Sequence, residues 1–281
     1  MTRRDAHASS RRRRTHARRF ALLAAIHGTL AALAATSPAS AAPPFVDRGI
    51  TLPRHDWAFD FGLGIAHDDR DNGAPTGVGL NLEGAVGITE NLELGLRTGL
   101  RMGNDGRATQ ADTYGRLFDR QTFGVNNDIT ANPEVRLRGA VYRGEVAEVA
   151  LEGRAYLPIE QDSRFGFLFG VPLMFHLGHS VRLDTGAFIP FVFYDPTYYA
   201  LSVPLDVWIQ ATDKLWLGPM TGLRFHHQGN FEQTDVELGF GLGYQIARAV
   251  DFKTTFYVPR INETAGARNF GVGAGIQVRI E

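Results

Sequence analysis

Charged residues recur at every second position in several segments of the sequence, a spacing that can build a polar surface. Side chains two residues apart lie on the same face of a β-strand. The candidate residues are Glu83, Glu93, Arg97, Arg101, Arg136, Arg138, Glu148, Glu152 and Arg154. Such a surface could orient a small polar solute in a transverse field. Alternatively, neighbouring-strand pairs such as Glu83 with Arg97, and Arg136 or Arg138 with Glu152, could neutralise one another and brace the sheet.

Residues 92–102 show the element that would position these side chains. In LELGLRTGLRM, leucine and methionine occupy one parity apart from Thr98, and glutamate, arginine and glycine occupy the other. This alternation is typical of a β-strand with one apolar and one polar face. The same pattern predicts strands at 56–66, 77–88, 92–102, 133–142, 147–158, 165–176, 181–192, 199–210, 215–225, 236–247, 250–259 and 269–280.

The connections between these strands alternate in length. Short ones are predicted at 89–91, 143–145, 177–180, 211–214 and 248–249, and longer ones at 67–76, 103–132, 159–164, 193–198, 226–235 and 260–268. An even number of strands in which every second connection is tight is typical of an antiparallel up-and-down transmembrane barrel. The sequence therefore predicts an all-β fold of about twelve strands, with both termini on the side of the tight turns.

The apolar parity of the predicted strands carries no charged residue, whereas the other parity collects the charges and many glycines. A barrel of about eight strands is just filled by its own side chains, so twelve strands enclose more room than one inward apolar layer can close. The apolar parity is therefore expected to face lipid and the polar parity to face the lumen. A soluble two-layered β-sandwich is the alternative.

The N-terminus has the order of regions found in a secretory signal peptide. An arginine-dense stretch precedes an apolar run from Phe20 to Ala35 and a small-residue site that predicts cleavage after Ala41. The predicted organisation is a signal peptide at 1–41, a periplasmic lead-in at 42–55 and a barrel at 56–281. Residues 1–41 carry eight arginines and one aspartate, so their removal leaves 21 basic and 29 acidic residues and argues against a nucleic-acid partner.

With this alternation and these connections, residues 56–280 resemble Gram-negative outer-membrane β-barrel proteins of the porin-like or channel-like group. The resemblance implies a multi-pass location in the bacterial outer membrane after export. It also implies contacts with outer-membrane lipid, lipopolysaccharide and the barrel-assembly machinery. The chain departs from the family pattern at its end, where Glu281 stands in place of the usual aromatic residue.

The polar parity divides into two walls. The segments between 77 and 158 carry most of the charge, whereas the first, tenth and twelfth predicted strands present mainly glycine. We expect these walls to lie roughly opposite each other on the ring. The connection 103–132 could fold inward as a constriction or lie outside as a surface loop, since loops of this length are usually functional or disordered.

Catalytic and metal sites find little support in the sequence. The mature chain has only three serines, namely Ser163 in a predicted loop, Ser180 in a predicted tight turn and Ser202 at an inward position without a histidine nearby in sequence, so serine catalysis is not expected. The pair His226-His227 on a predicted exposed loop, and the acidic group at 68–71, are expected to be solvated rather than metal-bound. No cofactor and no enzymatic activity are predicted.

The sequence thus predicts a passive channel for small polar solutes whose selectivity surface is the wall formed by 91–154. A structural or surface-interaction barrel with a plugged lumen is the alternative. A lipid-modifying outer-membrane enzyme is the third hypothesis.

Overall fold

The computed structural model describes residues 43–67, 76–102, 130–158, 164–193, 195–262 and 270–281. A short 3-10 turn, η1 (Phe45–Asp47), precedes twelve strands. The strands are β1 (Trp57–His67), β2 (Thr76–Thr89), β3 (Leu92–Met102), β4 (Thr130–Arg143), β5 (Ala147–Tyr156), β6 (Gly166–His176), β7 (Val181–Val192), β8 (Tyr198–Gln210), β9 (Leu215–Gln228), β10 (Phe231–Ala247), β11 (Val250–Val258) and β12 (Phe270–Ile280). The described ranges contain no helix long and apolar enough to cross a membrane.

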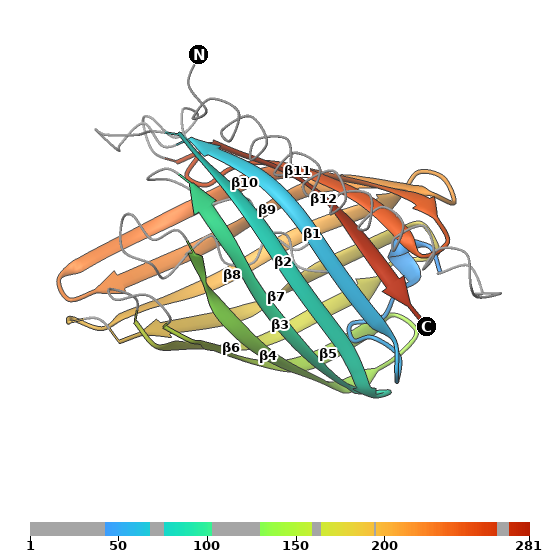
Figure 1. Cartoon of the computed structure of the whole chain (residues 1–281), viewed down its shortest axis with the longest axis horizontal. Helices are drawn as coiled ribbons and strands as arrows, with labels where there is room; N and C mark the ends of the chain where they lie inside the picture. Colours follow the sequence, from blue (N-terminus) through green and yellow to red (C-terminus); the bar gives the residue numbers. More distant parts are fainter. Residues whose placement is uncertain (1–42, 68–75, 103–129, 159–163, 194, 263–269) are drawn as a thin grey trace, which may run out of the picture. The chain divides into compact units, whose positions relative to one another are not determined.

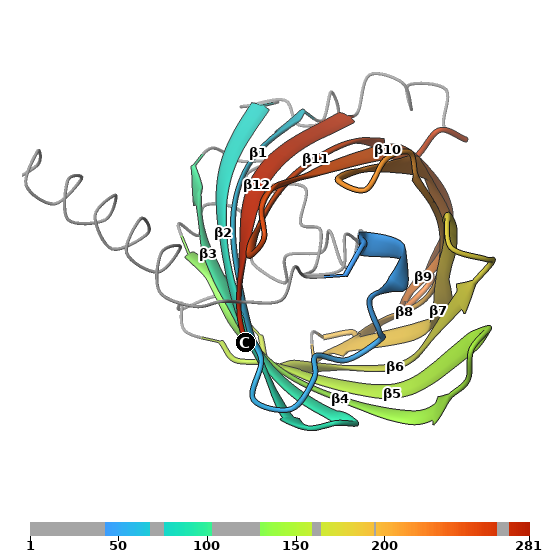
Figure 2. The same ribbon diagram turned by 90° about the vertical axis from the view of Figure 1, so that its right-hand side faces the viewer.

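Each strand pairs with its neighbours in sequence, and β1 pairs antiparallel with both β2 and β12. The ring is therefore closed, as the views from the side and along the barrel show (Figures 1 and 2). Closure leaves no free strand edge whose backbone donors and acceptors would need another partner. The predicted twelve-stranded antiparallel barrel is confirmed.

The two faces of the wall differ as the alternation predicts. Large apolar side chains on the outer parity are exposed, for example Phe61 (51%) and Leu96 (58%). Charged side chains on the inner parity are buried, and Glu93 and Arg138 have no exposed surface. The outer surface of the barrel is thus apolar, and its inner surface carries the charges.

The barrel has two unlike ends. At one, which we call the turn end, tight connections join β2 to β3, β4 to β5, β6 to β7, β8 to β9 and β10 to β11, and the chain stops after β12. We call the other the loop end. Most of the predicted 103–132 connection lies outside the described residues, so its inward or outward position stays a prediction.

One predicted loop is wrong. The connection at 226–235 is instead a hairpin, because β9 continues to Gln228 and β10 begins at Phe231, with Gly229 (φ 60°) in the turn. The alternation is weak here because polar residues occupy both parities. Backbone pairing, such as that of His226 with Gln233, extends the wall despite the lost alternation.

Candidate functional site

All of the predicted site residues except Arg101 are described with their side chains, and they lie on the inner face of β2 to β5. Arg101 belongs to β3, but its side chain lies outside the described part of the chain. The described members are almost fully buried: Arg97 is 6% exposed, Glu148 7% and Arg136 4%. Their burial in the lumen means that each charge needs a partner.

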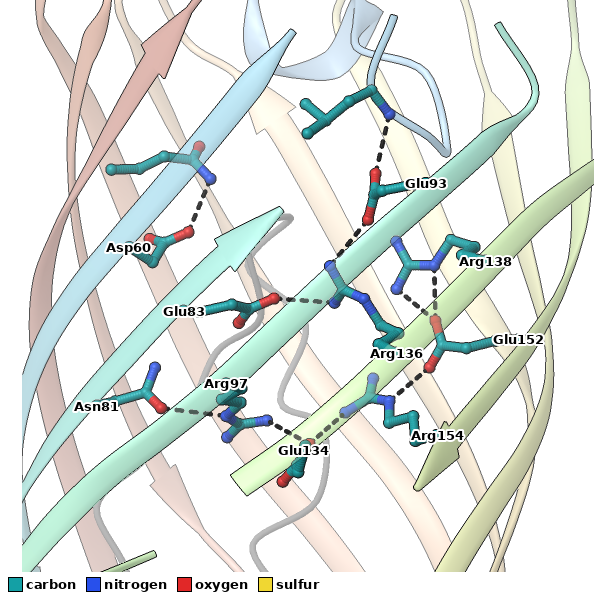
Figure 3. Close-up of polar contacts among 12 residues, drawn as sticks. Asp60, Asn81, Glu83, Glu93, Arg97, Glu134, Arg136, Arg138, Glu152 and Arg154 are labelled. Carbon is teal, nitrogen blue, oxygen red and sulfur yellow. Dashed lines mark hydrogen bonds and ion pairs between the residues drawn. The ribbon is translucent and has the colours of Figure 1, made fainter. Parts of the chain in front are cut away.

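The first group of ion pairs is centred on Arg136 of β4. Its Nη1 lies 2.9 Å from Glu83 Oε1 and its Nη2 donates to Glu93 Oε1 at 2.8 Å (Figure 3). Glu83 is on β2, so the guanidinium reaches across β3 to meet it. The reach is possible because Gly95 of β3 lies opposite Arg136 and has no side chain to block it. Glu83 thus pairs with Arg136 of β4, whereas the sequence predicted Arg97 of the adjacent strand as its partner.

The second group runs along β4 and β5 (Figure 3). Arg138 Nη2 lies 2.6 Å from Glu152 Oε2, which confirms the predicted pairing of these residues. Arg154 donates from Nε to Glu152 Oε1 at 2.7 Å, and its Nη1 lies 3.4 Å from Glu134 Oε2. The β2–β5 wall is therefore largely neutralised by its own ion pairs, as the bracing hypothesis expects.

Arg97 differs from the other arginines of this wall. Its Nε donates to Asn81 Oδ1 at 3.1 Å, while its Nη1 stays 3.8 Å from Glu134 Oε2. Among the described residues, neither Nη atom of Arg97 makes a hydrogen bond. Because a guanidinium carries five N–H donors in a planar fork, this side chain retains donors for a group that enters the lumen.

The segment from Pro44 to Pro53, which we call the N-terminal segment, lies inside the ring at the turn end (Figure 2). Four of its apolar side chains are buried, namely Phe45 (1%), Val46 (1%), Ile50 (0%) and Leu52 (5%). The sequence predicted only an extended lead-in here. Four apolar residues in a stretch without a regular period were the feature of the sequence that could have indicated burial of this segment.

Charged side chains of the wall bind the backbone of the N-terminal segment. Glu148 accepts from the Ile50 N–H at 3.1 Å and Glu93 from the Leu52 N–H at 2.9 Å. The predicted site residue Glu148 thus contacts the segment directly.

Cationic groups meet the carbonyl oxygens of the same segment. Arg138 donates to the Ile50 carbonyl at 3.3 Å, and Arg182 of β7 donates to the Phe45 carbonyl at 3.0 Å. The ring of His176 lies 2.8 Å from the Val46 carbonyl through Nδ1. Buried backbone N–H and C=O groups need hydrogen-bond partners, and the charged side chains of the lumen supply them for the segment. Neither Arg182 nor His176 was predicted as a site residue, because the carbonyl that each contacts belongs to the N-terminal segment and not to a neighbouring strand.

Two side chains anchor the segment more specifically. Phe45 stacks on Trp216 (ring centroids 4.8 Å apart, 3° between planes) and meets Trp208 edge-on at 5.4 Å. Arg48 forms a two-point ion pair with Asp251 of β11, at 2.5 Å from Nη1 to Oδ2 and 3.2 Å from Nη2 to Oδ1. Paired N–H···O bonds of this kind are strong and geometrically specific.

The predicted glycine wall is only partly open. On β10, a Cβ added at Gly241 or Gly243 would overlap the indole rings of Trp208 or Trp216, so these glycines make room for tryptophan. On β1 and β12, the glycines border a hollow beside Asp60, whose carboxylate lies 3.3 Å from Lys253 Nζ. Its inward-facing lining includes Gly62, Asn81, Lys253, Thr255, Gly273 and Gly275. Because β1 pairs with β2, this part of the glycine wall adjoins the charged wall, and the predicted opposite placement is wrong here.

The inner face also carries an apolar cluster that the predicted polar parity did not include. Its members are Tyr156, Leu168, Phe188, Val192, Tyr198 and Ala200, on β5 to β8. The Phe188 ring covers Gly170 of the neighbouring strand, where a Cβ would overlap it. Inward glycines thus again provide space for aromatic rings.

His226 and His227 lie on strand β9 and not on an exposed loop. His226 points inward, with Nδ1 2.7 Å from the Tyr198 hydroxyl and Nε2 2.9 Å from Asp235 Oδ2. Arg260 Nε donates to the same Asp235 oxygen at 3.0 Å. His227 has the outer parity and stacks near Tyr199, with ring centroids 4.6 Å apart. Hairpin extension, which the sequence did not predict, therefore gives the two histidines different surroundings.

The remaining predicted sites can be placed only in part. Ser202 Oγ accepts a hydrogen bond from Arg224 Nε at 2.9 Å, while Ser163 and the acidic group at 68–71 lie outside the described residues. Within the described ranges, no three histidine or carboxylate groups are placed to hold a metal ion.

No known protein-family profile and no curated protein matches the sequence. Solved structures do match the fold. The NanC porin aligns with a TM-score of 0.58 at 9% identity, over 79% of this chain and 100% of that one. The KdgM porin aligns with a TM-score of 0.52 at 9% identity, over 80% and 99%. A second KdgM structure, in complex with disordered oligogalacturonate, has a TM-score of 0.52 at 10% identity, over the same shares. The chain thus has the fold of outer-membrane β-barrel porins.

Proposed function

We propose that this chain is a porin-like passive channel of the bacterial outer membrane for small polar solutes. The observation that carries the proposal is the division of the closed wall into an apolar outer face and a charged inner face. A bilayer favours an apolar outer face, because charged side chains that face lipid destabilise a barrel. The charged inner face suits a water-filled path through the barrel. The likeness to the NanC and KdgM porins supports the same role.

The orientation follows from the two unlike ends. In outer-membrane barrels the tight turns lie in the periplasm and the longer loops lie outside. The turn end and the N-terminal segment are then periplasmic, after removal of residues 1–41 as a signal peptide by the export machinery. Outer-membrane lipid, lipopolysaccharide and the barrel-assembly machinery are the partners that this location implies.

Arg97 is our candidate for contact with the solute. Its Nη atoms make no hydrogen bond among the described residues, and its Nε is fixed by Asn81. A guanidinium held in this way favours a negatively charged oxygen, so a polar solute with an acidic group fits better than a cation. The KdgM porin, which was solved with oligogalacturonate, is an instance of this solute class in a barrel of the same fold. The proposed role includes no chemical step.

Planar-bilayer recordings of the refolded mature chain test the channel. We expect discrete current steps, and for Arg97→Gln a reversal potential shifted toward cation preference. The shift should correspond to about a two-fold change in permeability ratio, since a charge about 8 Å away in water contributes roughly 0.5 kcal/mol. Arg54→Gln, which alters an exposed arginine of the lead-in, is the matched control and should leave the ratio unchanged.

Absence of current steps in a barrel shown to be folded would overturn the channel. It would favour the second candidate function, a plugged structural barrel. The specific observation behind that alternative is the N-terminal segment, whose buried residues occupy the turn-end mouth.

A further inference from the structure

Part of the binding of the N-terminal segment is through backbone groups, which every peptide has. Its backbone N–H groups meet Glu148 and Glu93, and its carbonyls meet Arg138, Arg182 and His176. These partners come from strands β3 to β7, so they contact the segment from one side of the mouth. Recognition through main-chain hydrogen bonds provides affinity without fixing the sequence.

Specificity resides in two side chains that are three positions apart. Phe45 enters the cage formed by Trp208 and Trp216, and Arg48 pairs with Asp251. Arg182 adds a cation–π contact, since its guanidinium carbon lies 4.3 Å from the centre of the Phe45 ring. Buried aromatic and arginine anchors of this kind contribute most of the binding energy in protein interfaces. By contrast, the side chain of Asp47 is exposed, so an aspartate is not required at this position for binding.

The wall groups that bind the segment keep partners when the segment is removed. Glu93 remains paired with Arg136 at 2.8 Å. Glu148 keeps His176 at 3.0 Å, which is a counter-charge only when it is protonated, and Arg143 at 3.9 Å.

The other wall groups follow the same pattern. Arg138 keeps Glu152 at 2.6 Å and Arg182 keeps Asp184 at 2.7 Å. Asp251 has Arg279 at 4.0 Å. Release of the segment therefore leaves none of these buried charges without a counter-charge, which avoids the largest cost of opening such a site.

The free end of the segment also permits release. Cleavage after Ala41, which the sequence predicts, would place the new N-terminus at Ala42, three residues before Phe45, so this side of the segment would be a chain end. At its other side, Pro53, Arg54 and His55 are exposed and link the segment to β1. The segment can thus withdraw from the mouth without a break in the barrel wall.

We propose that the turn-end mouth is a peptide-binding site that the chain's own N-terminal segment occupies, and that another peptide with an aromatic residue three positions before an arginine can replace it. Occupancy of the mouth closes the lumen at that end. The closing effect rests on the proposed channel function, whereas the peptide binding does not.

Peptide binding is tested on a mature barrel that lacks residues 43–53. A synthetic peptide spanning 42–54 is added to the refolded barrel while tryptophan fluorescence is recorded, since Trp208 and Trp216 line the cage and the peptide contains no tryptophan. We expect a saturable change in emission. Peptides with Phe45→Ala or Arg48→Ala should bind at least about tenfold more weakly, whereas Asp47→Ala should bind like the natural sequence. Equal binding of all four peptides, or no binding to a folded barrel, would overturn the proposal.

A second variant covers the case in which the shortened barrel does not fold. A protease recognition sequence inserted after Pro53 allows the full chain to fold first and to be cut afterwards at this exposed site. We expect the cut segment to dissociate on dilution and the peptide to rebind. A cut segment that stays bound after extensive washing would contradict release.

Conductance separates the two proposals. Barrels without the segment should show larger current steps than the full chain, and the 42–54 peptide should reduce them from the turn-end side only. Binding by fluorescence with no current in either form would sink the channel and leave the peptide site standing. Current that is equal with and without bound peptide would show that occupancy does not close the lumen.

Discussion

Replacement of Arg182 by methionine is expected to lower the free energy of unfolding by about 3–5 kcal/mol, the usual cost of removing one partner from a buried ion pair. Arg182 has no exposed surface and pairs with Asp184 of the same strand at 2.7 Å. In the register of β7 and β8, Asp184 lies directly opposite Asp206. Loss of the guanidinium therefore leaves two buried carboxylates facing each other. Urea unfolding in detergent micelles, followed by tryptophan fluorescence, measures the effect.

Two further variants identify the cause of this destabilisation. The double variant Arg182→Met/Asp184→Asn removes the stranded charge while it keeps the side-chain volume, so it should recover part of the lost stability. Arg54→Met changes an exposed arginine and should stay within about 0.5 kcal/mol of the natural chain. If Arg182→Met behaved like Arg54→Met, the buried pair would not contribute as the structure indicates.

Gly243→Ala is expected to destabilise the barrel by about 1–3 kcal/mol, as extra atoms do in a packed interior. The new Cβ would overlap the indole of Trp216, which is only 2% exposed. Trp216 cannot simply turn away, because Phe45 stacks on its other face at 4.8 Å. We therefore expect loss of the near-ultraviolet circular dichroism signal of this cluster together with the lower unfolding midpoint.

Gly153→Ala is the matched control for this substitution. A Cβ at Gly153 has nothing within 4 Å, and alanine is intrinsically better than glycine in a strand by about 0.5–1 kcal/mol. The control should thus be neutral or slightly stabilising. Equal stability of the two alanine variants would mean that Trp216 does not lie against Gly243.

Much of the wall was predictable because a strand's pattern is local. The segment 92–102 has the bounds of β3, and its leucines face outward while Glu93 and Arg97 face inward. Pairing between strands was less predictable, because an arginine is long enough to reach past one neighbour. Arg136 meets Glu83 across β3, since Gly95 leaves its path clear.

The sequence by itself determined the number of strands, the closed ring and the facing of the residues in the alternating segments, because period-two alternation is set by backbone geometry within each segment. Only the tertiary structure decided what occupies the lumen. Arg48 meets Asp251 across 203 positions, and Phe45 reaches a cage built by β8 and β9. The N-terminal segment has no hydrophobic periodicity from which these contacts could be predicted. Its place depends on the cavity that the closed barrel creates, and that cavity exists only once distant strands have met.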